Sequence, residues 1–239
     1  MKKHIIIITA ITLLISNSCG CGTKKAYVSG ERYLPTGIMP REAIVILLNE
    51  SMKHHVNIES EGKEHSVESC MGNAMNSVNP QLKIVSAKEF RRALFPGKKF
   101  KDAPRSAEAL LLSLQDEESR HHVQDLGIRY LIVVDTDTHK YGEKTEFAAQ
   151  GGVWAVGQSW TRYSNFLAFV IDVKQPAKSG SFSSSSSGNA GFAVPFFYIV
   201  PLPPVPLIAA TESEACSSLG TAVVNFLEGH EDPNIENIE

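Results

Sequence analysis

Two apolar runs constrain the fold of this chain more than any other feature of its sequence. Ala43–Leu48 is the unbroken apolar run AIVILL, and Ile128–Val134, IRYLIVV, is the strongest strand pattern of the chain. The unbroken run at 43–48 indicates a strand buried on both faces, because a strand with one wet face alternates apolar and polar residues. Such strands need cover on both sides, which predicts helices packed against a sheet.

Segments with helical periodicity lie between and after these runs. Their apolar residues recur every three or four positions, and glycine, proline or asparagine follows several of them. Thr211–Glu214 has the sequence of a capping box before the closing helix. The predicted helical stripes cover residues 67–78, 87–94, 107–114, 123–126 and 215–227.

The sequence pattern changes after Val134. There, glycine, serine, asparagine and proline separate stretches that resemble strands. These later strands are expected to be antiparallel and to complete a mixed sheet. The fold class is therefore predicted to be α/β, a single compact domain with a mixed sheet covered by helices. The further predicted strands are Leu82–Val85, Thr145–Ala155, Asn165–Val173 and Ser181–Ser187.

The amino terminus has the layout of a secretory signal. A basic start precedes an apolar run, Ile5–Ile15, that is too short to span a bilayer as a stable helix. Small residues then precede Cys19 and Cys21, which resembles the lipobox where bacterial lipoproteins are cleaved and acylated. We predict acylation of Cys19, with Cys21 as the rival acceptor. The alternatives are ordinary secretion without a lipid and an uncleaved anchor.

The predicted boundaries follow from this signal and from composition. Residues 1–18 form the signal peptide, 19–41 a flexible tether, 42–228 the α/β domain and 229–239 a disordered tail. Glycine rather than aspartate follows Cys19, which favours the outer membrane over retention at the inner membrane. The expected location is the cell envelope, as an outer-membrane lipoprotein that faces the periplasm and is held by membrane lipid.

Composition and charge exclude some partners. Of the 239 residues, 43% are hydrophobic and 21% are charged, as in folded globular proteins. The formal net charge is −3, and removal of Lys2 and Lys3 with the signal makes it −5. This charge gives no electrostatic footprint for nucleic acid. The sequence has neither a phosphate-binding glycine loop nor a zinc-type cysteine cluster, so no cofactor is expected.

The two other cysteines, Cys70 and Cys216, each lie in or beside the apolar stripe of a predicted helix. An oxidising periplasm allows such a pair to form a disulfide, and we predict this bond. The alternative is two buried, unpaired thiols that pack as small hydrophobic groups.

Asp135, Asp137 and His139 alternate directly after the strand Ile128–Val134, so their side chains share one face of an extended segment. Two carboxylates and an imidazole can bind a divalent metal or act as an acid/base pair. Ligands also collect beyond the carboxyl ends of strands in α/β sheets. The same pattern describes the solvated face of a strand that leaves the core, which is the alternative.

Aromatic and proline residues suggest a surface for partners. One short glycine-rich stretch contains four aromatic side chains, and exposed aromatic residues commonly anchor interfaces. A proline-rich segment follows, which is expected to be extended, as proline-rich recognition requires. The alternatives are core filling by the aromatic residues and a stiff connection made by the prolines. The predicted partner-binding residues are Trp154, Trp160, Tyr163, Phe166, Pro203 and Pro204.

The passage Asp125–Val134, a helix end followed by a glycine and an apolar strand, is similar to a passage of the TolB amino-terminal-like and curli-secretion (CsgG)-like periplasmic domains. The strand Phe169–Val173 resembles a later strand of the same superfamily. Over roughly residues 42–227 the chain therefore resembles a bacterial lipoprotein of that fold. The resemblance implies binding and assembly roles, such as secretion-pore subunits, Tol-system partners or activators of peptidoglycan synthases, and it brings no catalytic residue.

We therefore expect a non-enzymatic, lipid-anchored envelope protein that binds another envelope protein or supports an assembly. A metal-dependent or hydrolytic periplasmic enzyme centred on Asp135, Asp137 and His139 is one alternative. A small-ligand sensor with an apolar pocket under the aromatic residues is the other.

Overall fold

The computed structural model describes residues 26–49, 60–95, 103–104, 106–150, 153–197, 200–201, 203–207 and 210–230. The predicted signal peptide, the acylation candidates Cys19 and Cys21, and residues 231–239 of the predicted tail lie outside these ranges. The elements follow one another as β1 (Tyr27–Arg32), β2 (Ala43–Leu48), α2 (Ser60–Val78), β3 (Lys83–Val85), α3 (Ala87–Leu94), α4 (Ala107–Gln115), α5 (Glu117–Asp125), β4 (Ile128–Gln150), β5 (Val153–Asp172), β6 (Ala177–Phe197), β7 (Val200–Pro201), β8 (Val205–Leu207) and α6 (Thr211–Leu227).

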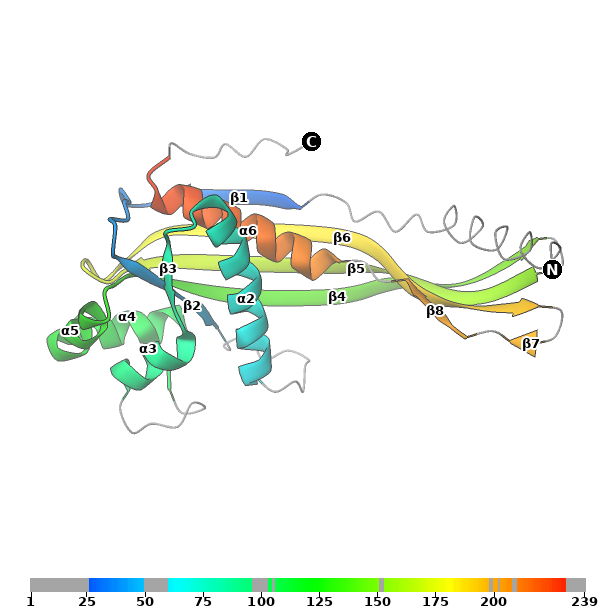
Figure 1. Cartoon of the computed structure of the whole chain (residues 1–239), viewed down its shortest axis with the longest axis horizontal. Helices are drawn as coiled ribbons and strands as arrows, with labels where there is room; N and C mark the ends of the chain where they lie inside the picture. The colour runs from blue at the N-terminus through cyan, green and yellow to red at the C-terminus, as the bar shows by residue number, and fades with distance from the viewer. Residues whose placement is uncertain are drawn as a thin grey trace. The chain divides into compact units, whose positions relative to one another are not determined.

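The described strands form one mixed sheet in the order β1-β6-β5-β4-β2-β3, and β7 and β8 also pair with β6 (Figure 1). β2 runs parallel to β3 and to β4. In contrast, β1, β7 and β8 run antiparallel to β6. The fold class predicted from the sequence, an α/β fold with a mixed sheet covered by helices, is confirmed.

The described residues group into two compact units. One, which we call the helix-covered unit, consists of the described residues within 26–138, 164–186 and 212–230. The other, which we call the sheet extension, consists of the described residues within 139–163 and 187–211. β4, β5 and β6 each contribute residues to both units. Within the described ranges, no helix combines the length and hydropathy needed to cross a bilayer.

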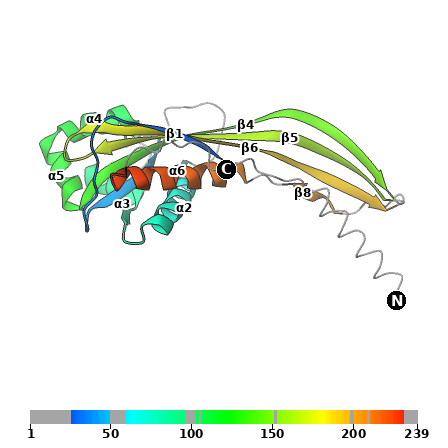
Figure 2. The same cartoon turned by 90° about the horizontal axis from the view of Figure 1, so that it is seen from above.

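One face of the sheet in the helix-covered unit packs under α2 and α6 (Figure 2). Met71 of α2, Leu219 of α6 and Ile132 of β4 belong to this core and are fully buried. A Cβ atom at Gly220 of α6 would lie 2.9 Å from the carbonyl oxygen of Met71. Glycine at this position therefore allows the two helices to approach each other closely.

The opposite face of the same sheet packs under α3, α4 and α5. Phe90, Leu110 and Val123, one from each helix, are fully buried against Leu131 and Val133 of β4. β2 lies between β3 and β4 in this doubly covered region, and all six of its residues are buried. The unbroken apolar run at 43–48 is thus the sequence of a strand with helices on both sides.

Side-chain caps fix where the three helices of this face begin. Ser86, Ser106 and Asp116 have extended backbones, and their side chains accept the backbone N–H of the residue three positions later. Such N-caps satisfy donors that the first helical turn leaves unpaired. This explains why three short helices start at serine or aspartate.

A buried ion pair connects the two sides of this unit. Arg91 of α3 donates to Glu64 of α2 over 2.6 Å, and both side chains are almost fully buried. The same carboxylate oxygen accepts the backbone N–H of Leu48 at 3.0 Å, and Arg91 also donates to the carbonyl oxygen of Pro104 at 3.0 Å. The pair therefore ties α2, α3 and the end of β2 together.

The strands after α5 are longer than the sequence predicts. β4, β5 and β6 span 23, 20 and 21 residues. The predicted strand Thr145–Ala155 is wrong as a single element, because β4 ends at Gln150 and β5 begins at Val153. Gly142 has a φ of 67° inside β4, so this glycine marks an irregularity within the strand and not its end. Polar residues and glycine in an exposed strand look like turns in the sequence.

Residues 27–32 correct part of the prediction that 19–41 is a flexible tether. They form β1, which pairs with β6 from Tyr27↔Ser185 to Arg32↔Gly180. Only Val28 of this strand is fully buried, because β1 is an edge strand. Its hydrophobic signal is therefore too weak to be seen in the sequence.

Candidate functional site

The sheet extension exposes one edge of β4. β2 pairs with β4 only from Ala43↔Ile128 to Leu48↔Val134. Beyond Val134, the side of β4 that faces away from β5 has no strand partner among the described residues. Residues 139–149 are all solvent-exposed. A row of unpaired backbone N–H and C=O groups is a template on which another strand can pair.

Aromatic side chains gather on one face of the extension, which we call the aromatic face. Trp154 of β5 stacks on Phe196 of β6 with ring centroids 4.1 Å apart and an interplanar angle of 5°. Phe147 of β4 lies 6.0 Å from Trp154 between ring centroids and is 68% exposed. Trp160 lies an even number of residues from Trp154 and so shares its face. The Lys140 ammonium is 4.6 Å from the ring centroid of Trp160.

The other face of the extension is polar. Ser159 donates a hydrogen bond to Glu146 over 3.0 Å, and Thr161 donates to Asn189 over 3.5 Å. Ser159 and Thr161 flank Trp160 in β5 and therefore point away from the aromatic face. One face of the extension thus carries the rings of Phe147, Trp154, Trp160 and Phe196, and the other carries these hydrogen-bonded polar groups together with Tyr163.

The members of the predicted triad lie in three environments. Asp135 is buried, with 8% of its surface exposed, whereas Asp137 is half-buried and His139 is exposed. Burial raises the pKa of Asp135, a hydrogen bond from Asn49 opposes this, and the charge of Glu108 adds to the increase. Among the described residues, no three histidine, cysteine, aspartate or glutamate side chains are grouped so that they could hold a metal ion. A metal site at the triad stays a prediction.

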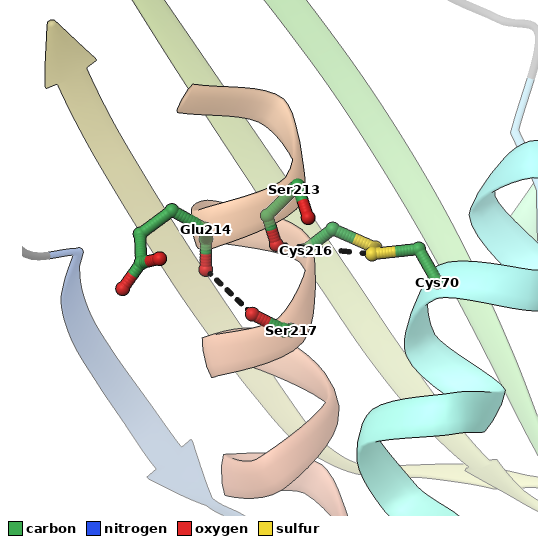
Figure 3. Close-up of a disulfide and its surroundings, with 5 residues drawn as sticks. All are labelled: Cys70, Ser213, Glu214, Cys216 and Ser217. Atoms are coloured by element: carbon green, nitrogen blue, oxygen red, sulfur yellow. Dashed lines mark hydrogen bonds between the residues drawn. A yellow bond between two sulfur atoms is a disulfide. The ribbon is translucent and has the colours of Figure 1, made fainter. Parts of the chain in front are cut away.

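The two cysteines that were predicted to form a disulfide lie on two helices, α2 and α6. Cys70 of α2 and Cys216 of α6 form a disulfide, with Cα atoms 6.3 Å apart (Figure 3). Cys216 is buried and Cys70 is half-buried. Ser217, the next residue of α6, donates a hydrogen bond to the carbonyl oxygen of Glu214 over 3.2 Å. The structure brings the two cysteines to bonding distance, which fits the disulfide expected from the sequence.

The predicted partner-binding residues divide between surface and core. Trp154 and Trp160 lie on the aromatic face, and Tyr163 is half-buried in the extension. The prediction is wrong for Phe166, which is only 4% exposed because it packs in the core under α2 and α6. The exposed residues Pro203 and Pro204 lie between β7 and β8, both of which pair with β6.

Sequence reasoning missed Phe147, Phe196 and the free edge of β4. The aromatic residues of the extension lie on three strands, and only the adjacency of β4, β5 and β6 brings their rings together. One sequence signal for them is the alternation of large aromatic residues with polar residues, which is the two-residue period of a strand. The edge itself has no sequence signal, because it arises where β2 ends and β4 continues.

A pocket of about 600 Å³ lies in the helix-covered unit, between α2, the start of α6 and strands β4 and β5. Phe166, one of the four aromatic residues singled out in the sequence, is among its lining residues, and several of its walls carry hydroxyl groups. Its lining consists of His65, Ser66, Val67, Ser69, Cys70, Thr136, Thr138, Phe166, Glu212, Ser213 and Cys216.

No family model and no curated protein matches the chain. Among solved structures, it is similar to the PelC dodecamer from Paraburkholderia phytofirmans, with 12% identity and a TM-score of 0.37 over 86% of this chain and 100% of that chain. It is also similar to lipoprotein GNA1162 from Neisseria meningitidis, with 13% identity and a TM-score of 0.30 over 63% of this chain and 83% of that chain. At these scores the likeness assigns neither family nor function, and the resemblance to TolB-like and CsgG-like domains stays a prediction.

Proposed function

We propose that the protein is a non-enzymatic, lipid-anchored protein of the bacterial cell envelope whose sheet extension binds another protein. One observation carries this proposal. The edge of β4 has no strand partner beyond Val134 in the described part of the chain, and the aromatic face, on which Phe147 is exposed and Trp154 and Phe196 are half-buried, lies on β4, β5 and β6.

The free edge suits strand addition. An extended segment of a partner that pairs with β4 gains backbone hydrogen bonds, and alternate side chains then determine which segment fits. Lys140, Lys144 and the irregular Gly142 lie along this edge. Charged residues and irregularities of this kind prevent indiscriminate pairing of edges. A partner therefore has to match the pattern of charges on β4.

The aromatic face supplies anchors beside this edge. Phe147, Trp154 and Phe196 contact one another in a row across three strands. Because the rings already support one another, few rotamers have to be fixed on binding, which lowers the entropic cost of association. Aromatic anchors of this kind are common among residues whose truncation costs about 2 kcal/mol or more of binding energy.

Two features support the envelope location. The sequence begins with a basic start, an apolar run and a lipobox-like passage before Cys19. In addition, Cys70 and Cys216 form a disulfide, and such bonds persist mainly in oxidising compartments such as the periplasm.

Photocrosslinking in intact cells that make the full chain tests this proposal. A photoreactive residue is placed at Thr145 or at Phe147, both exposed on β4, and at Glu118 on the exposed surface of α5 as the matched control. We expect adducts of defined mass at the two β4 positions and none at Glu118. The proposal fails if β4 gives no adduct, or if all three positions give the same adducts.

A further inference from the structure

We infer that the pocket between α2 and α6 binds a primary ammonium group carried on a short aliphatic chain. This site is separate from the sheet extension, because all of its lining residues belong to the helix-covered unit. Its volume of about 600 Å³ falls within the range of roughly 300–1,000 Å³ that is usual for small-molecule sites.

The charges around the pocket favour a cation. Glu212 and His65 line it, and neither lysine nor arginine is among the described residues of its lining. The start of α6 contributes a partial positive charge of about half an elementary charge. The full negative charge of Glu212 exceeds this partial positive charge, so an anionic ligand is disfavoured and a cationic one is attracted.

The polar groups match the hydrogen bonds that an ammonium group makes. An ammonium has three N–H donors and no acceptor, and it therefore needs acceptors on several sides. Thr138 donates to one carboxylate oxygen of Glu212 over 3.1 Å, which holds this side chain beside the sheet. A carboxylate has about four lone-pair positions, so it can accept further donors. The hydroxyls of Ser66, Ser69 and Ser213 are further acceptors in the lining.

The remaining walls suit an aliphatic chain. Val67 and Phe166 are buried apolar residues, and the Cys70–Cys216 disulfide forms a further weakly polar surface between the helices. Methylene groups that leave water against such walls contribute to the affinity through the hydrophobic effect. A charged head beside Glu212 and an apolar stem against these walls together describe an alkylammonium ligand.

Binding of three small molecules of equal chain length tests this inference. Isothermal titration of the full chain in low salt compares 1,5-diaminopentane with the neutral 1,5-pentanediol and the anionic glutarate. We expect the diamine to bind about tenfold or more tightly than the diol, because it makes charged hydrogen bonds. Glutarate is expected not to bind. Equal affinities of the diamine and the diol overturn the inference, as does the absence of diamine binding.

Two charge-matched variants locate the site. Glu212→Gln should weaken diamine binding about tenfold or more, because it removes the carboxylate that lines the pocket. Glu214→Gln removes the same charge from the same turn of α6 outside the lining, and we expect it to stay within about twofold of the unchanged protein. Circular dichroism verifies that both variants fold. An equal loss in both variants indicates general charge attraction and overturns the assignment of the site.

Discussion

Strand β4 passes through two environments, because helices cover both faces of its first part whereas its later part is exposed. From Tyr130 to Val134 every residue has 0% of its surface exposed, with core side chains on both faces of the sheet. From His139 to Ala149 every residue is exposed. The backbone conformation is a strand in both stretches, so the difference lies in what covers it. Burial of apolar surface stabilises the first stretch, whereas the second carries the exposed edge at which we propose that a partner binds.

The largest difference in the free energy of unfolding is expected between alanine variants of two phenylalanines, Phe226 and Phe147. Phe226 is buried, with its ring edge-on to Phe182 at 4.9 Å between centroids and the Arg32 guanidinium 4.5 Å from its centroid. Phe226→Ala should lower the free energy of unfolding by about 3–5 kcal/mol, because it leaves a cavity. Phe147→Ala in the extension should change it by less than about 0.5 kcal/mol. Urea unfolding of both variants measures these changes. Similar losses in the free energy of unfolding in the two variants would contradict the prediction.

Reduction of the disulfide should destabilise the helix-covered unit. Cys70 and Cys216 close a loop with a sequence separation of 146 residues. Opening so long a loop should lower the free energy of unfolding by about 2–4 kcal/mol, because the unfolded chain regains freedom. Urea unfolding with and without dithiothreitol checks this.

The double variant Cys70→Ser with Cys216→Ser is the control, because dithiothreitol should not change its unfolding midpoint. Crosslinking from Thr145 should persist in this variant as long as it stays folded, since the disulfide lies in the other unit. If dithiothreitol leaves the unchanged protein unaffected, the bond contributes nothing to its stability.

A smaller and pH-dependent effect is expected at Asp135, at the boundary of the covered part of β4. Burial raises the pKa of this carboxyl, so the folded state binds its proton more tightly than the unfolded state does. Stability is therefore lost as the pH rises from the ordinary aspartate range through the raised value. Asp135→Asn should remove this loss and make the protein more stable than the unchanged chain near pH 7.

The gain in Asp135→Asn should vanish in acid, where the carboxyl is protonated in both states. Urea unfolding of both proteins between pH 3 and pH 8 measures the difference. A difference that does not depend on pH would show that Asp135 acts through packing or hydrogen bonding, and not through its charge.

A small effect on stability and the clearest effect on binding are expected at Trp154. Its ring stacks on Phe196 in the extension. Trp154→Ala should lower the free energy of unfolding by about 1 kcal/mol, as aromatic pairs contribute about that much beyond their buried area. It should nevertheless abolish the adducts formed from Thr145. Adducts of unchanged yield would remove the aromatic face from the proposed interface.

The helix-covered unit could be predicted from the sequence because its signals are local. The run at 43–48 is β2, and the segment 87–94 is α3 with the same bounds. Burial on both faces gives a strand a continuous apolar sequence, and serine or aspartate caps mark the helix starts. The Cys70–Cys216 pair could be inferred because only two cysteines lie outside the amino-terminal region.

The sheet extension could not be predicted in the same way. Its strands are exposed, so polar residues and Gly142 occur where a buried strand has apolar residues. Phe166 was assigned to the surface with its aromatic neighbours, because the sequence does not show where along β5 the cover of α2 and α6 ends. β1 was missed for a related reason, since one buried residue gives no pattern.

Amide hydrogen exchange along β4 tests most directly whether one strand joins a packed region to a binding surface. Mass spectrometry follows peptides covering 128–135 and 139–150, in the purified chain and in the crosslinked complex isolated from cells. We predict that 128–135 is protected in both samples, and that amides on the free edge of 139–150 exchange rapidly alone and slowly in the complex. Equal protection of both stretches in the purified chain, or unchanged exchange of 139–150 in the complex, would contradict this.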